Sequence, residues 1–176
     1  MTETDYLSLN TTTKPININE FPFLNVNDND KRIEFPDEKC EIQEDLIIPK
    51  GYIVTAKPGC RINLTNSSKI ISYSPILFIG GANNLIYITS SDSTGQGIVV
   101  FSCERISELS YVSFDNLSNI SDFGWDLRGA ITFYESPVRI ANCQFKNSRT
   151  EDSLNIINSR FSIDKTLFQS SFSDAI

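Results

Sequence analysis

Two stretches decide the fold: VRIANCQFKNS at residues 138–148 and FSIDKTLFQSS at residues 161–171. Apolar residues recur between them at a constant interval, because Ile163 follows Ile140, and Phe168 follows Phe145, by 23 residues. A period near 23 residues without helical spacing is typical of one solenoid turn with about three short strands. The two stretches therefore predict stacked β-strand turns.

Earlier segments repeat the pattern more loosely. LSYVSFDN at residues 109–116 and NLIYITS at 84–90 precede the Ile140 segment, and GIVV at 97–100 matches AITF at 130–133. Because strand side chains alternate between faces, every second residue would point inward, and stacking the turns about 4.8 Å apart builds a continuous core. We expect one internal column of Ile88, Phe114, Phe145 and Phe168. We expect a polar ladder at the following turn, formed by Ser90, Asn116, Asn147 and Ser170.

The predicted fold class is all-β, a right-handed parallel β-helix over residues 46–176. Residues 1–45 are turn-rich and polar without helical periodicity, so we expect a tail followed by a segment that caps the open end of the solenoid. An antiparallel β-sandwich also gives short alternating strands. It does not explain an offset that holds across both strands and turns.

Composition narrows the function classes. The formal net charge is -7, which disfavours a nucleic-acid partner, because phosphate neutralisation needs clustered Lys and Arg. The chain has no His, which excludes Ser-His-Asp catalysis and His-containing metal sites. Its four Cys form no C-x-x-C pair, so we expect small buried apolar side chains.

No targeting or membrane segment is evident. Residues 1–10 have neither a basic nor an apolar region of the kind that a secretory signal contains. No apolar run approaches the roughly 20 residues of a membrane span. We expect either a cytoplasmic protein or a piece of a longer exported one.

Several motifs carry a family resemblance. They are LIIPKG at residues 46–51 with Pro58-Gly59, GIVV at 97–100, GAITFY at 129–134, EDSLNI at 151–156 and SDA at 173–175. From Leu46 onward the chain resembles the right-handed parallel β-helix repeat family of the pectate-lyase-like superfamily. It is similar to a bacterial subgroup in which this module accompanies envelope-associated domains. The resemblance implies polysaccharides as the commonest substrate class but carries over no active site. In that subgroup the chain runs on past this point, so the end at Ile176 suggests a fragment.

The first candidate site is a pair of carboxylates. Asp152 and Asp174 each precede the start of an apolar strand and are 22 residues apart, so we expect them in adjacent layers. Two such close carboxylates either raise one pKa, as in acid/base pairs, or bind a hard cation such as Ca²⁺, with Glu151 adding an oxygen and Asn155 on the next strand facing outward. The alternative is two solvated turn residues.

The second candidate site is an insertion. The interval from Phe114 to Ala130 exceeds the matching interval from Phe145 to Ser153 by eight residues, and the insertion falls within residues 119–128. Inserted loops on solenoids commonly form the binding face. Trp125, Phe123 and Asp126 lie in this one and suit a sugar ring. Alternatively, Trp125 folds over the solenoid side as an apolar lid.

Arg128 is the third candidate. It precedes Glu151 by the repeat of 23 residues, so we expect an interlayer ion pair of little energetic worth. A catalytic base, as lyases use, is the alternative.

These features leave two functional hypotheses. One is a non-catalytic module that scaffolds or binds carbohydrate or a partner protein at an envelope. The other is a polysaccharide lyase or glycoside hydrolase that uses Asp152 and Asp174 with a cation or with Arg128. We also expect a homodimer through the open C-terminal turn, because its backbone groups are unpaired.

Overall fold

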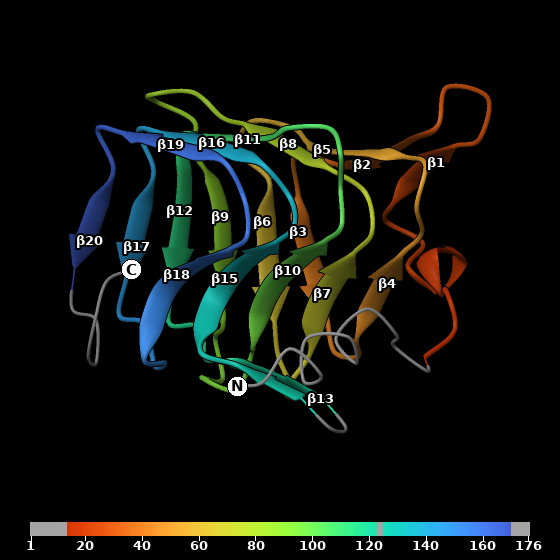
Figure 1. Ribbon diagram of the computed structural model, residues 1–176. Coiled ribbons are helices and arrows are strands. Elements are labelled where there is room, and N and C mark those ends of the chain that lie inside the picture. Colours follow the sequence, from red (N-terminus) through yellow and green to blue (C-terminus); the bar gives the residue numbers. More distant parts are fainter. Residues whose placement is uncertain (1–13, 123–124, 170–176) are drawn as a thin grey trace.

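The computed structural model describes residues 14–122 and 125–169, without the side chain of Trp125. The chain forms a parallel β-solenoid of about 6 turns, whose turns contribute strands to three sheets (Figure 1). This parallel pairing excludes the antiparallel sandwich. The right-handed winding stays a prediction. Among the described residues, no helix has the length and apolar character to cross a membrane.

Three sheets, named A, B and C, form the sides of the solenoid. Sheet A contains, in spatial order, β1 (Asn25–Asn27), β2 (Arg32–Phe35), β5 (Ile53–Ala56), β8 (Ile76–Ile79), β11 (Ser107–Ser110), β16 (Val138–Ala141) and β19 (Phe161–Asp164). Sheet B contains β3 (Lys39–Ile42), β6 (Arg61–Leu64), β9 (Ile86–Thr89), β12 (Val112–Asp115), β17 (Gln144–Lys146) and β20 (Leu167–Gln169). Sheet C contains β4 (Leu46–Ile48), β7 (Lys69–Ser72), β10 (Gly97–Phe101), β15 (Gly129–Tyr134) and β18 (Asp152–Ile157).

The predicted internal column is confirmed. Ile88 aligns with Phe114, Phe114 with Phe145, and Phe145 with Phe168 in the ladders of sheet B. The three phenylalanine rings stack with 4.8 Å between successive centroids. This spacing equals the separation of neighbouring strands, so the rings repeat in step with the backbone.

The predicted polar ladder is confirmed only in part. Asn116 and Asn147 both have positive φ, at 59° and 49°, a conformation that Asn tolerates at turns. The side-chain amide of Asn116 donates to the backbone carbonyl of Ser90 at 2.7 Å, which is a bond between neighbouring turns, as predicted. The Asn147 amide instead donates to the Asp115 carboxylate at 2.8 Å. Ser170 lies outside the described residues.

The solenoid begins earlier than the repeat indicates. Strands β2 and β3 already pair in parallel with β5 and β6, so the first turn starts at Arg32 and the expected boundary at Leu46 falls inside that turn. Both strands of this turn alternate between polar and buried apolar residues, as RIEF at residues 32–35 and KCEI at residues 39–42, and this alternation was the available signal for an earlier start. Ahead of it, β1 pairs antiparallel with β2, and the short 3₁₀ helix η1 (Ile18–Glu20) contacts β4.

All four cysteines are free and buried, as expected for small apolar side chains. Burial raises the pKa of the Cys103 and Cys143 thiols to about 11. The thiolate forms of Cys103 and Cys143, which would react with oxidants and metals, are therefore scarce at neutral pH.

Candidate functional site

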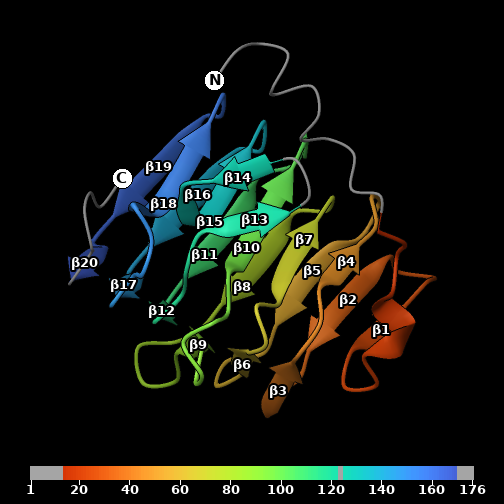
Figure 2. The same ribbon diagram turned by 90° about the horizontal axis from the view of Figure 1, so that it is seen from below.

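The insertion forms an antiparallel hairpin of β13 (Ile120–Asp122) and β14 (Trp125–Leu127). Figure 2 shows this hairpin lying across the outer side of sheet C, near β10 and β15. Ile120 and Leu127 face each other across the hairpin and are both buried. They pack with outward-facing residues of sheet C in a second apolar cluster that includes Ile47, Ile71, Val99, Phe101 and Tyr134. This part of the insertion seals the sheet.

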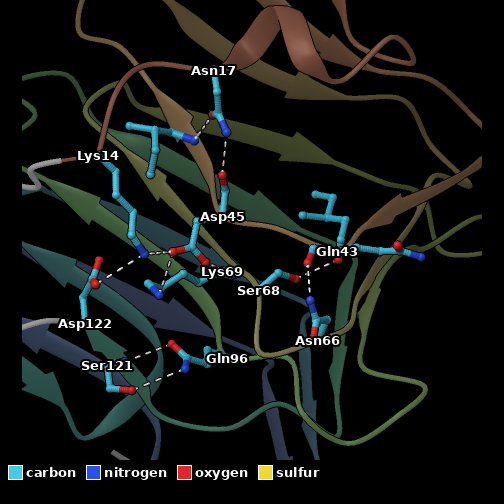
Figure 3. Close-up of polar contacts among 12 residues, drawn as sticks. Lys14, Asn17, Gln43, Asp45, Asn66, Ser68, Lys69, Gln96, Ser121 and Asp122 are labelled. Carbon is cyan, nitrogen blue, oxygen red and sulfur yellow. Dashed lines mark hydrogen bonds and ion pairs between the residues drawn. The ribbon is translucent and has the colours of Figure 1, made fainter.

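Polar side chains hold the hairpin in place (Figure 3). The side-chain oxygen of Gln96 accepts a hydrogen bond from the backbone amide of Ser121 at 3.1 Å. The side-chain nitrogen of Gln96 donates to the Ser121 hydroxyl at 3.3 Å. Lys14 pairs with Asp122 of the hairpin at 3.3 Å and also with Asp45. The segment before η1 is therefore tied to both the hairpin and the solenoid.

Asp45 is the centre of this network. Its carboxylate pairs with Lys69 at 2.9 Å, and the Lys69 side chain is only 5% exposed. Burial lowers the pKa of Lys14, but its bonds and charge interactions with Asp45 and Asp122 outweigh this effect, so the pKa lies above its ordinary value. Lys14 therefore stays charged at neutral pH.

Asn17 closes the free edge of sheet C at β4. Its side-chain oxygen accepts the Ile47 amide hydrogen at 2.9 Å, and its nitrogen donates to the Asp45 carbonyl at 2.8 Å. The amide side chain thus replaces a neighbouring strand and satisfies backbone groups that would otherwise stay unpaired.

The predicted sugar-binding residues of the insertion are only partly described. Phe123 lies outside the described residues, and the side chain of Trp125 is not described. The Asp126 carboxylate is exposed and accepts a hydrogen bond from Asn119 at 2.7 Å, within the same excursion of the chain. A binding role for Trp125, Phe123 and Asp126 stays a prediction.

The predicted ion pair between Arg128 and Glu151 is confirmed at 3.1 Å. Both side chains are largely exposed, so the pair contributes little to stability. The Asp152 amide donates to the Arg128 carbonyl at 3.1 Å, which fixes the register of this turn. Asp174 lies outside the described residues, and the approach of Asp152 to Asp174 stays a prediction.

No group of three or more His, Cys, Asp or Glu side chains suited to a metal ion occurs within residues 14–122 and 125–169.

Asn155 faces outward from β18, aligned with Thr132. A Cβ atom placed on Gly129 would approach the Cβ atom of Asn155 to 2.5 Å, so Asn155 packs closely over that glycine. The absence of a side chain at Gly129 therefore accommodates Asn155.

A further hollow lies at the corner where strands of sheet C lead into sheet A. We name it the tyrosine pocket, and its volume is about 200 Å³. Three successive corner turns line it with Tyr52, Tyr73, Lys50, Glu104 and Arg105. It thus combines aromatic rings, two cations and one carboxylate.

Side chains outside the pocket lining contact both tyrosines. The Tyr73 ring stacks on Phe101 with 5.9 Å between centroids, and Phe101 belongs to the sealed cluster under the hairpin. The Tyr52 hydroxyl donates to Asp28, which raises the pKa of Tyr52, and the Lys31 ammonium lies 5.0 Å from the Tyr52 ring centroid. These contacts fix both rings at the pocket wall.

Sequence reasoning missed this pocket. Tyr73 follows Tyr52 by 21 residues, close to the solenoid period, and this spacing was the available signal. Glu104 and Arg105 come from the turn before β11, whose position in space follows only from the register.

Comparisons with family models, curated proteins and solved structures find no match to this chain. The fold therefore rests on the strand pairing, and the superfamily stays a prediction.

Proposed function

We propose that this protein is a non-catalytic module that binds carbohydrate in the tyrosine pocket. The observation that carries the proposal is the lining of that pocket, with Tyr52 and Tyr73 beside Lys50, Arg105 and Glu104. Ligand sites typically combine apolar or aromatic walls with a few polar groups that fix orientation. Tyrosine ring faces suit the CH groups of a sugar, the two cations donate to its oxygens, and the carboxylate accepts from its hydroxyls.

The state of the acidic candidates supports a binding role over a catalytic one. Glu151 is engaged with Arg128 at the surface. The outer side of sheet C, on which an extended substrate would otherwise lie flat, is covered by the hairpin. The repeat motifs that resemble the bacterial subgroup support a setting within a larger envelope-associated protein.

Calorimetric titration with fragments of neutral and anionic polysaccharides, with and without Ca²⁺, tests the proposal. We expect saturable binding that falls at least about tenfold in Tyr52→Ala and in Arg105→Ala, since each change removes one wall of the pocket. Tyr87→Ala is the matched control. Tyr87 lies on the outer side of sheet B with the Arg61 guanidinium 4.9 Å from its ring centroid, much as Lys31 lies over Tyr52.

Two results would overturn the proposal. Equal affinity in the wild type, Tyr52→Ala and Arg105→Ala would remove the tyrosine pocket as the site. Release of unsaturated or reducing ends from a polysaccharide, lost in Asp152→Asn, would identify a lyase or hydrolase instead. Assaying products by absorbance and by reducing-sugar formation in the same samples separates the two outcomes.

A further inference from the structure

A second hollow follows the tyrosine pocket along the same corner of the solenoid. We name it the arginine groove. It has a volume of about 260 Å³ and is lined by Arg139, Arg160, Ile106, Pro137 and Phe161, with Val138 and Ser162. Arg105 lines the tyrosine pocket and Ile106 lines the groove, so the two hollows adjoin.

The register explains how the groove is assembled. Ser107 aligns with Val138, and Val138 aligns with Phe161, in the ladder of sheet A. The residues that precede these positions therefore lie in successive turns, about 4.8 Å apart. They are Ile106, Pro137 and Arg160.

The groove exposes apolar side chains. Phe161 is 58% exposed and Ile106 is 37% exposed, whereas Val138 is buried. Both exposed side chains line the one hollow, and exposed apolar surface that gathers with a polar rim marks contact sites.

The polar lining of the groove selects the charge of that ligand. Arg139 pairs with Glu108 at 3.5 Å, and both side chains are largely exposed. Arg160 makes no ion pair within residues 14–122 and 125–169. No carboxylate or amide side chain lines the groove, so sugar hydroxyls would find few acceptors there. Guanidinium groups instead match carboxylates, which they bind through paired hydrogen bonds.

We propose that the arginine groove binds an extended acidic peptide in which one apolar side chain is flanked by carboxylates. The apolar side chain enters between Ile106 and Phe161, and the carboxylates bind Arg139 and Arg160. Glu108 competes with the peptide for Arg139, because it holds that guanidinium in the free protein. The groove shares no lining residue with the tyrosine pocket.

Fluorescence anisotropy with the full chain and a fluorescein-labelled Glu-Glu-Leu-Glu-Glu peptide tests this proposal. We expect saturable binding that weakens as salt rises, and affinity at least about tenfold lower for Gln-Gln-Leu-Gln-Gln and for Glu-Glu-Ser-Glu-Glu. Arg160→Ala should weaken binding about tenfold or more. Glu108→Gln should strengthen it several-fold, because Arg139 is released.

Arg128→Ala is the matched control, since Arg128 is an exposed arginine in a comparable ion pair outside the groove, and we expect no change in affinity. The opposite signs expected for Arg160→Ala and Glu108→Gln separate a specific site from a loss of folding. Equal binding of the charged and neutral peptides, or no response to either substitution, would overturn the proposal. Displacement of the peptide by an anionic oligosaccharide, or Arg160-dependent self-association without peptide binding, would assign the groove to another occupant.

Discussion

The outer faces of sheets B and C differ although the same turns build both. Sheet C carries Ile71, Val99 and Phe101 outward, and the hairpin covers them. Sheet B carries Arg61, Tyr87 and Gln144 outward, on a side that none of the described strands covers. A regular solenoid thus reserves one side for packing and leaves another to solvent.

The residue patterns of the strands account for the difference between the two outer faces. Sheet B strands alternate between apolar and polar residues, as in β9, where Ile86 and Ile88 face inward and Tyr87 and Thr89 face outward. In sheet C, β10 has no polar side chain, and all five of its residues are buried. Continuous apolar strands are typical of sheets covered on both faces. The apolar residues that face outward from sheet C therefore require a cover, which the hairpin provides, just as the inward residues require burial in the core.

The largest effect should come from removing a covered outward side chain. Phe101 is 1% exposed and contacts both Tyr73 and Tyr134. Phe101→Ala should lower the free energy of unfolding by about 3–5 kcal/mol, since it leaves a cavity under the hairpin. Tyr87→Ala, the equivalent change on sheet B, should cost under about 1 kcal/mol. Urea denaturation of both variants measures the difference, and equal losses would show that the two faces are alike.

The sequence predicts the inward-facing residues of the solenoid well. The 23-residue offset places Phe168 next to Phe145, and the same offset lengthened by the eight inserted residues places Phe145 next to Phe114, because inward residues must repeat in step with the strand spacing. The same offset places Arg128 beside Glu151. Offsets of this kind transfer directly from sequence to space only where the turns have equal length.

The outer half was harder to predict. The sequence left open whether the insertion binds a ligand or places Trp125 over the solenoid side, and it did not single out Ile120 and Leu127, which turn toward sheet C. The continuous apolar character of β10 and β15 was the available signal for a cover, but a period of two residues alone does not reveal it. The tyrosine pocket and the arginine groove depend on corner turns of unequal length, which no single offset relates.

A second test concerns the ion pairs that fasten the cover. Asp45→Asn keeps the shape of the side chain but leaves Lys69, which is 5% exposed, without its charged partner. An unpaired buried charge is costly, so we expect a loss of about 3 kcal/mol. Glu34→Gln is the control, because its pair with Lys57 at 3.7 Å lies at the surface and should contribute under about 0.5 kcal/mol. Similar losses in the two variants would contradict a special role for Asp45.

A smaller effect should follow from loosening the hairpin alone. Gln96→Ala removes two hydrogen bonds to Ser121, which should cost about 1 kcal/mol and speed exchange of the Ser121 amide hydrogen. Asn119→Ala removes the exposed bond to Asp126 and should leave that amide unchanged. Hydrogen exchange followed by mass spectrometry resolves this segment. Unchanged protection in Gln96→Ala would mean that the apolar contacts alone hold the cover.

The smallest effect should appear at the loop that follows β9, where a carboxylate rather than an apolar lid holds the chain. The Asp92 carboxylate accepts backbone hydrogen bonds from Asn66 at 2.9 Å and from Thr94 at 3.0 Å, which lower the pKa of Asp92 to about 2. The unfolded chain releases this proton near pH 4. The ionised carboxylate therefore stabilises the folded state fully above about pH 4, and this contribution disappears as the pH falls through about 2.

Thermal melting between pH 2 and pH 7 tests this contribution. The melting temperature of the wild type should exceed that of Asp92→Asn at pH 6, and the gap should close toward pH 2 because protonation removes the same charge. The sealed face provides the contrast, since Phe101→Ala carries no titrating group and should lower the melting temperature by a similar amount throughout this range. A gap between wild type and Asp92→Asn that stayed constant with pH would show that Asp92 acts through its shape and not through its charge.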